Sequence, residues 1–189
     1  MADFLKCVNF EDVSGTIAAL PDDKIEWFLS EALERRFGKA RLGTASYEFV
    51  LTLPEGYRVL VSTNWVESEV CNGGIAQFFW NRHQDYELIV ADALVGYEKL
   101  GAKEQAEALR ACMSAFLQVR GAFLRLRDQP RRRSPQHLDP FQVWSDFWND
   151  RCHGLDWPLM EYEEISTRYR IPWIRLHAQA FVFSCNQDT

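Results

Sequence analysis

Apolar residues recur every three or four positions along almost the whole chain, which is the spacing of one face of an α-helix. The clearest stripe follows Pro21 and two aspartates, and it stops at Gly38, a residue type that commonly ends helices. Its apolar members are Ile25, Phe28, Leu29, Ala32 and Leu33. We therefore expect an amphipathic helix between Pro21 and Gly38.

The same spacing predicts helices along most of the remaining chain, separated by glycines and prolines. The expected segments are residues 45–51, Pro54 to about Cys71, Gly74–Trp80, Tyr86 to about Gly101, Lys103 to about Leu126, a helix marked by Phe141, Trp144, Phe147 and Trp148, Pro158–Arg170 with Asp156 as its N-cap, and a last helix that Pro172 opens and that carries Trp173, Leu176 and Ala180. A short strand fits only at Val59–Ser62 and Phe181–Phe183. We predict an all-α, irregular multi-helix bundle that forms a single domain over residues 1–189, with an exposed loop at 128–140 and a frayed polar tail at 184–189.

Composition places the chain among ordinary globular proteins, with 47% hydrophobic and 25% charged residues. The N-terminus lacks the basic and apolar regions of a secretory signal, and no apolar run is long enough to span a membrane. Five cysteines without a CxxC pair favour reduced thiols over a disulfide framework. We therefore expect a cytoplasmic protein.

The net charge of −6 is concentrated near the N-terminus, where residues 1–34 hold eight acidic residues and two lysines. An acidic chain is poorly suited to direct contact with nucleic acid, whose phosphates need Lys and Arg, but it suits a basic protein partner. The candidate partner-binding acids are Asp22, Asp23, Glu26, Glu31 and Glu34. A solvated helix face and a dedicated binding surface both remain open as interpretations.

Signatures of catalysis are missing from the sequence, which contains no GxGxxG, GxxxxGK[ST], GxSxG or HExxH motif. The four histidines are far apart along the chain, and we expect no metal site and no cofactor. A Cys–His pair that meets only in the fold stays open as an alternative. The expectation is a protein without enzymatic activity.

The most distinctive segment, residues 66–81, reads as a helix, a tight turn and a second helix. Asn72 and Gly73 tolerate the backbone conformation that ends a helix, and Gly74 allows two backbones to approach closely. Glu69 and Gln77 are expected to bond the amides that the turn leaves free, and Phe78, Phe79 and Trp80 to anchor it in the core. A fold-defining corner is the simplest interpretation; a ligand pocket there, or catalysis by Glu69, is the alternative.

The residues of this corner also carry a resemblance to a known family. The pattern of Glu69, Asn72, Gly73, Gly74, Gln77, Phe78, Phe79 and Asn81, followed by a helix that ends in Leu-Gly-Ala at residues 100–102, resembles the family of DNA mimic protein 19. The similarity is clearest over residues 54–116. The resemblance implies an all-α fold, a homodimer and no enzymatic activity, and it suggests a carboxylate surface that imitates duplex DNA and occupies the DNA-binding face of another protein.

Two features bear on that expectation. Acidic residues four apart on a helix lie about 6 Å from each other, close to the spacing of neighbouring phosphates. An arginine-rich segment departs from it, since a DNA mimic does not need the cluster Arg125, Arg127, Arg131, Arg132 and Arg133. That segment reads as a solvated loop, a contact to the acidic helix of a second subunit, or a contact to nucleic acid.

These observations lead to one main hypothesis and two alternatives. The main hypothesis is a non-catalytic regulatory or inhibitory protein that binds a basic protein, such as a DNA-binding protein, through its acidic surface. An immunity or anti-defence protein that neutralises a toxin or nuclease would use the same surface. An enzyme or small-molecule binder would use the Asn-Gly-Gly corner instead.

Overall fold

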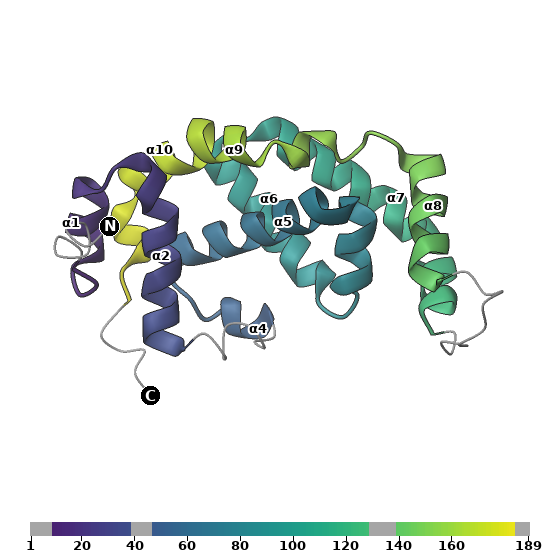
Figure 1. Cartoon of the computed structure of the whole chain (residues 1–189), viewed down its shortest axis with the longest axis horizontal. Helices are drawn as coiled ribbons and strands as arrows, with labels where there is room; N and C mark the ends of the chain where they lie inside the picture. Colours follow the sequence, from purple (N-terminus) through teal and green to yellow (C-terminus); the bar gives the residue numbers. More distant parts are fainter. Residues whose placement is uncertain (1–8, 39–46, 129–138, 184–189) are drawn as a thin grey trace. The chain divides into compact units, whose positions relative to one another are not determined.

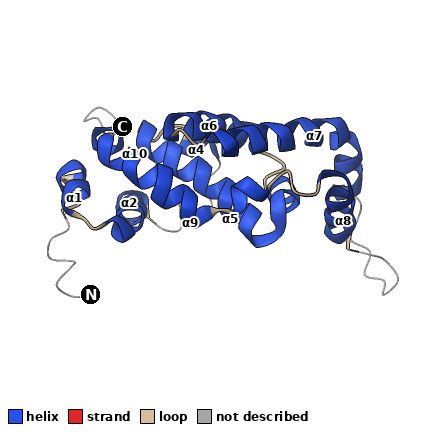
Figure 2. Cartoon of the chain, turned by 90° about the horizontal axis from the view of Figure 1, so that it is seen from above, coloured by secondary structure: helices blue, strands red, loops and turns tan. Residues whose placement is uncertain are grey.

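The computed structural model describes residues 9–38, 47–128 and 139–183, and every regular element in them is helical (Figures 1 and 2). The all-α prediction is therefore confirmed for this part of the chain. The residues fall into two compact units, one made of residues 1–61 with 163–189 and one of residues 62–162. The single domain stays a prediction.

Helical elements make up most of the described residues. In chain order they are α1 (Val13–Ala19), α2 (Asp22–Phe37), α4 (Tyr47–Val50), α5 (Glu55–Asn81), α6 (Tyr86–Leu100), α7 (Lys103–Arg127), α8 (Pro140–Cys152), the 3₁₀ helix η2 (Trp157–Met160), α9 (Tyr162–Ile165), the π-helical turn η3 (Ser166–Arg170), α10 (Ile171–Leu176) and the 3₁₀ helix η4 (Ala178–Phe181). None of these helices is long and apolar enough to cross a membrane.

The first unit joins residues from the two ends of the chain. Its helix α2 buries the five apolar positions that the sequence pattern predicts, and Gly38 ends it with a φ of 81°. Helix α1, which the pattern did not predict, begins where the Asp12 carboxylate accepts a hydrogen bond from the Gly15 amide at 2.8 Å. Arg175 on α10 donates to the carbonyl oxygens of Ile17 and Leu20 at 3.0 and 2.7 Å, and so ties α10 to α1.

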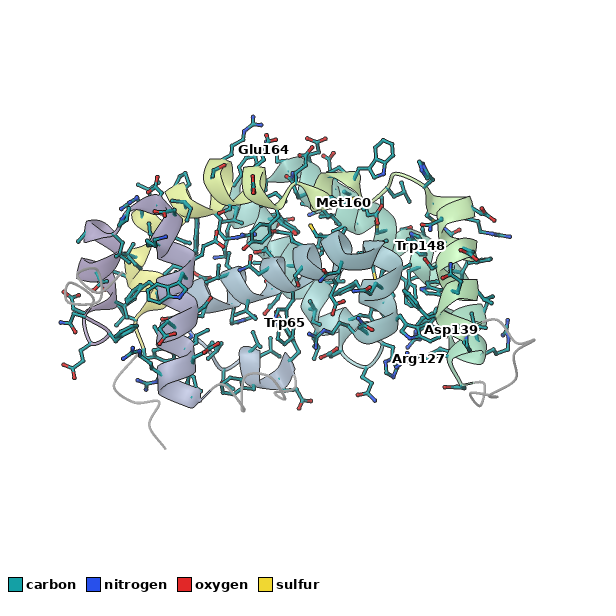
Figure 3. The ribbon with its side chains drawn as sticks, in the orientation of Figure 1. Trp65, Arg127, Asp139, Trp148, Met160 and Glu164 are labelled. Carbon is teal, nitrogen blue, oxygen red and sulfur yellow. The ribbon has the colours of Figure 1, made fainter. Side chains whose placement is uncertain are left out.

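The second unit is built on an aromatic core. Phe79 of α5 stacks on Phe116 of α7 with ring centroids 3.9 Å apart, and Trp144 and Trp148 of α8 close the cluster. Trp148 lies on the side of α8 that faces this core (Figure 3). Offset and edge-on ring contacts of this kind add stability beyond the burial of apolar area.

Helices α6 and α7 form a tight hairpin. Gly101 ends α6 in the left-handed conformation, with φ 77° and ψ 12°, and α7 begins two residues later. The predicted boundaries of both helices are confirmed to within one residue. Helix α8 is also confirmed, and Asp139 starts it by accepting from the Phe141 amide at 3.1 Å.

Several predictions about the last quarter of the chain are wrong. The expected helix over Pro158–Arg170 is three shorter elements, η2, α9 and η3. Asp156 occupies the N-cap position of η2, but its side chain makes no capping hydrogen bond there. The turn η3 runs directly into α10, so Pro172 lies in the second position of a helix that it does not open. Leu176, expected on the apolar face, is 81% exposed. The two places where a short strand would have fitted are not strands, in agreement with the all-α prediction: Val59–Ser62 lies in α5, and Phe181–Phe183 lies in and after η4.

Candidate functional site

The Asn-Gly-Gly corner is a sharp kink within α5. The helix loses its regular backbone at Gly73 and Gly74 and resumes at Ile75. Gly74 has φ 73° and ψ 173°, a combination that is open almost only to glycine. The prediction of a helix, a tight turn and a second helix is therefore confirmed.

The kink leaves the Ile75 amide without an acceptor in its own helix, and a residue far along the chain provides one. Ile75 N–H donates to Asp156 Oδ2 at 2.8 Å, and both groups are buried. One residue on, the Trp144 indole donates to the Ala76 carbonyl at 3.0 Å. The expectation that Glu69 and Gln77 would bond the free amides is thus wrong for Ile75, because a carboxylate 81 positions away does so.

Glu69 instead ties the two arms of the kink together through side chains. Its Oε2 accepts from Gln77 Nε2 at 2.9 Å and from Asn81 Nδ2 at 2.8 Å. Arg82 approaches the other carboxylate oxygen at 3.7 Å and also covers the ring of Trp65, which lies on the first arm (Figure 3). Three motif residues that are 8 and 12 positions apart therefore form one polar clamp across the bend.

The apolar motif residues anchor the second arm. Phe78 and Phe79 are fully buried, as predicted. Trp80 is half-buried and lies under the guanidinium of Arg127, 4.9 Å from the ring centroid. Asn72 and Gly73 are exposed on the outside of the turn.

One thiol and one carboxyl group lie on the first arm next to the corner. Cys71 is exposed and its thiol donates to the Met160 carbonyl at 3.5 Å. Partial burial, and then the nearby carboxylate of Glu67, raise the pKa of the Cys71 thiol. Glu67 is fully buried and accepts a hydrogen bond from the Tyr97 hydroxyl at 3.1 Å. Because a raised pKa reduces the thiolate population, this arrangement disfavours a nucleophilic role for Cys71.

The corner thus uses its polar groups to hold its own shape. A Cβ on Gly74 would lie 3.3 Å from Asp156 Oδ2, so the space inside the bend is already taken by this carboxylate. Glu69 is committed to the clamp. These contacts favour the fold-defining interpretation of the corner over the ligand-binding one.

The five predicted acids of α2 separate into two groups. Asp22 and Glu26 serve the fold: Asp22 accepts from Arg175 Nε at 2.9 Å, and Glu26 pairs with Arg170 Nη1 at 3.2 Å and accepts from the Ser166 hydroxyl at 2.7 Å. The Arg170 side chain is fully buried. A charged group buried with its partner is a structural contact rather than a surface for binding, and this holds for Glu26 with Arg170. Asp22 bonds Arg175 while its side chain stays 69% exposed.

Asp23, Glu31 and Glu34 form the second group, on the side of α2 away from its buried apolar residues; Asp23 is exposed, and Glu31 and Glu34 are half-buried. Asp23 pairs with Lys24 at 2.8 Å and Glu31 with Arg35 at 3.0 Å, both at the surface. Trp27 lies between them along the helix and is 42% exposed. Helical spacing places Trp27 four residues from both Asp23 and Glu31 and seven from Glu34, so these four side chains share one side. We call Asp23, Trp27, Glu31 and Glu34 the outer face of α2.

An open groove, which the sequence did not indicate, lies between α7 and α8. It encloses about 290 Å³ and is lined by Ala122, Phe123, Arg125, Leu126, Val143, Trp144 and Phe147. This volume is just below the range of about 300–1,000 Å³ that is typical of ligand pockets. The lining offers aromatic surface and one guanidinium.

The remaining sequence predictions concern metal binding and the arginine-rich segment. Within residues 9–38, 47–128 and 139–183, no group of three or more His, Cys, Asp or Glu side chains is arranged to hold a metal ion. The arginine segment is covered only in part, since Arg125 lines the groove and Arg127 covers Trp80, whereas Arg131, Arg132 and Arg133 lie outside the described residues.

Comparison with known proteins is consistent with this structural core. No curated protein and no solved structure matches the chain. The family model described as DMP19-like protein matches residues 51–177, which is about two thirds of the chain and includes the whole corner, α6, α7 and α8. The chain therefore belongs to the DMP19-like protein family.

Proposed function

We propose that this chain acts without catalysis, by binding a basic protein through the outer face of α2. Membership of the DMP19-like family supports a binding role, and the family resemblance suggests a DNA-binding protein as the partner. The observation that carries the proposal is the separation of the acidic residues of α2 into structural and outward-facing groups.

The exposed ion pairs of the outer face are easily exchanged. Asp23–Lys24 and Glu31–Arg35 are surface pairs, and such pairs contribute only about 0–1 kcal/mol. A partner that brings its own Arg or Lys can replace Lys24 or Arg35 at little cost. An exposed Trp among carboxylates further suits a basic side chain, because a guanidinium or ammonium is attracted to the indole face.

The length of α2 limits how much DNA this face can imitate. Its 16 residues extend over about 24 Å, a distance over which duplex DNA carries about 14 phosphates. Three outward carboxylates match only a small part of that charge. The outer face of α2 therefore fits a compact basic site, and imitation of a longer duplex requires carboxylates from other elements as well.

The test is capture of a partner from host lysate on tagged full-length chain, with elution first by duplex DNA and then by high salt. The informative variant is Asp23→Arg with Glu34→Arg, which leaves the structural pair Glu26–Arg170 intact. The matched control is Glu104→Arg with Glu107→Arg, which makes the same change of charge at exposed positions on α7.

We expect the wild type and the control to retain a specific protein and the α2 variant to lose it. Release by duplex DNA would identify a DNA-binding partner, whereas release by salt alone would favour the toxin-neutralising alternative. Equal retention by the α2 variant and the wild type would refute the proposed surface.

A further inference from the structure

The open groove between α7 and α8 has a buried aromatic floor. Phe123 and Trp144 form this floor, and their ring centroids lie 4.8 Å apart. The Trp144 indole is held in place by its hydrogen bond to the backbone of α5. Leu126, Val143 and Phe147 are half-buried and form the walls. The groove therefore offers solvent a fixed apolar surface, made largely of rings.

The residues that line the groove include one cation and no carboxylate. The cation is Arg125, which is exposed at the rim. Arg110 and Arg120 on the same helix each pair with a glutamate of α6, whereas no carboxylate in the described part of the chain pairs with Arg125. A Cβ added at Gly121 would lie 3.6 Å from Arg125 Nη1, so the guanidinium lies back along α7 over a glycine that does not screen it. This guanidinium is open to a ligand.

The size of the groove favours a small molecule over a peptide. Its volume of about 290 Å³ is nearly twice the roughly 150 Å³ of a cavity that holds one benzene ring, so it has room for about two rings. Its lining comes from residues 122–126 and 143–147, and five helical residues extend over only about 7 Å. A helix bound in a groove anchors side chains seven positions apart and needs about 10 Å.

We propose that the groove between α7 and α8 binds a small organic acid with a flat apolar body of about two rings and one carboxylate. The rings pack on Phe123 and Trp144, where offset and edge-on ring contacts are favourable. The carboxylate pairs with Arg125, whose planar guanidinium can bond both oxygens at once. Arg151 lies over the ring of Phe147, 4.6 Å from its centroid, and adds a second positive charge beside the groove. These two cations favour an anion locally, although the chain carries a net charge of −6.

The probe for the experiment is β-naphthoic acid, which has two rings and one carboxylate. It is titrated into the isotope-labelled full chain, and the indole N–H signal of Trp144 in N–H correlation NMR spectra reports occupancy of the groove. A ligand of this size should bind with a dissociation constant of about 0.1–1 mM. The neutral β-naphthamide has the same shape and should bind about 5-fold more weakly, because it lacks the charge that Arg125 recognises.

Two variants separate the roles of charge and space. Arg125→Gln should remove the difference in affinity between the acid and the amide. Ala122→Phe places a ring in the groove and should weaken the binding of both compounds by about 10-fold or more. The matched control is Arg110→Gln, the same change on α7 at a residue that does not line the groove. All three positions are exposed, so the variants should fold like the wild type, which circular dichroism checks.

A wild type in which the Trp144 signal shows no saturable shift would overturn the proposal. So would equal affinities for the acid and the amide, or binding that Arg125→Gln and Ala122→Phe leave unchanged. If β-naphthoic acid failed to bind while an acetylated dipeptide of aspartate and tryptophan shifted the same signal, the groove would be a site for a protein side chain, and the small-molecule ligand would be refuted. None of these outcomes depends on the outer face of α2.

Discussion

The backbone of Gly74 makes a sharp test of the kink in α5. Replacing Gly74 with Ala forces a side chain into a left-handed φ of 73° with an extended ψ of 173°, a region that costs a non-glycine residue about 1–3 kcal/mol. The new Cβ would also lie 3.3 Å from Asp156 Oδ2, so this carboxylate would have to shift by a few tenths of an ångström and its hydrogen bond to the Ile75 amide would be strained. That hydrogen bond to a charged group contributes about 1.5–3 kcal/mol. Because the chain can relax in part, we expect a total loss of about 3 kcal/mol.

Gly101→Ala is the matched control. Gly101 has nearly the same φ, 77°, but its ψ of 12° is the ordinary left-handed helical value, and no atom lies within 4 Å of an added Cβ. Its replacement should cost only about 1 kcal/mol. Urea denaturation followed by circular dichroism measures both losses, and the difference of about 2 kcal/mol corresponds to about 4–8 °C in thermal midpoint. Equal losses in free energy of unfolding for the two variants would refute the argument that the backbone conformation at Gly74 and the neighbouring Asp156 carboxylate require glycine there.

Three further predictions concern individual side chains. Glu26→Gln should lower the free energy of unfolding by about 3 kcal/mol, because it removes the carboxylate that pairs with the buried Arg170. Asp23→Asn, which changes a surface pair, should alter the free energy of unfolding by less than about 0.5 kcal/mol. Urea titration of both variants measures the two effects. Cys71 should react with a thiol-specific alkylating reagent more slowly at pH 8 than a free model thiol, since burial first and a neighbouring carboxylate second raise its pKa; a rate at or above that of the model thiol would contradict this. His83 has a lowered pKa, chiefly through burial, so the unfolded chain takes up its proton first and stability should fall as the pH drops below about 6.5; denaturation of His83→Gln across this range should show a weaker dependence.

Local patterns were sufficient where the cause of the structure is itself local. The apolar spacing of α2 identified all five of its buried apolar residues, and the glycines at 38, 73, 74 and 101 marked the places where helices end or bend. The corner was predicted because Asn72 and Gly73 tolerate the backbone conformation that ends a helix and Gly74 allows two backbones to approach closely. These features depend on residues within about one or two turns of each other.

The failures involve partners that are distant in sequence. Asp156 has the position of a helix cap, yet it bonds Ile75, a choice that no local pattern reveals. In the sequence, Asp22 and Glu26 resemble surface acids. In the fold they pair with Arg175 and Arg170, which lie 153 and 144 positions further along the chain. After Asp156 the chain forms η2, and α9, η3 and α10 then follow one another without a break, so the helical periodicity predicted neither the gap at Glu161 nor the π-helical turn.

The arginine contacts of the first unit also set an order of events during synthesis. Residues 62–162 are synthesised as one continuous segment that contains the partners of its own helices. Helices α1 and α2, in contrast, contact Arg170 and Arg175, which are synthesised much later. At about 5–20 residues per second, the ribosome needs roughly 7–30 s to cover the 144 positions between Glu26 and Arg170. Throughout that interval α2 lacks the ion pairs of Asp22 and Glu26 with Arg175 and Arg170, and transiently exposed apolar surface is prone to aggregation.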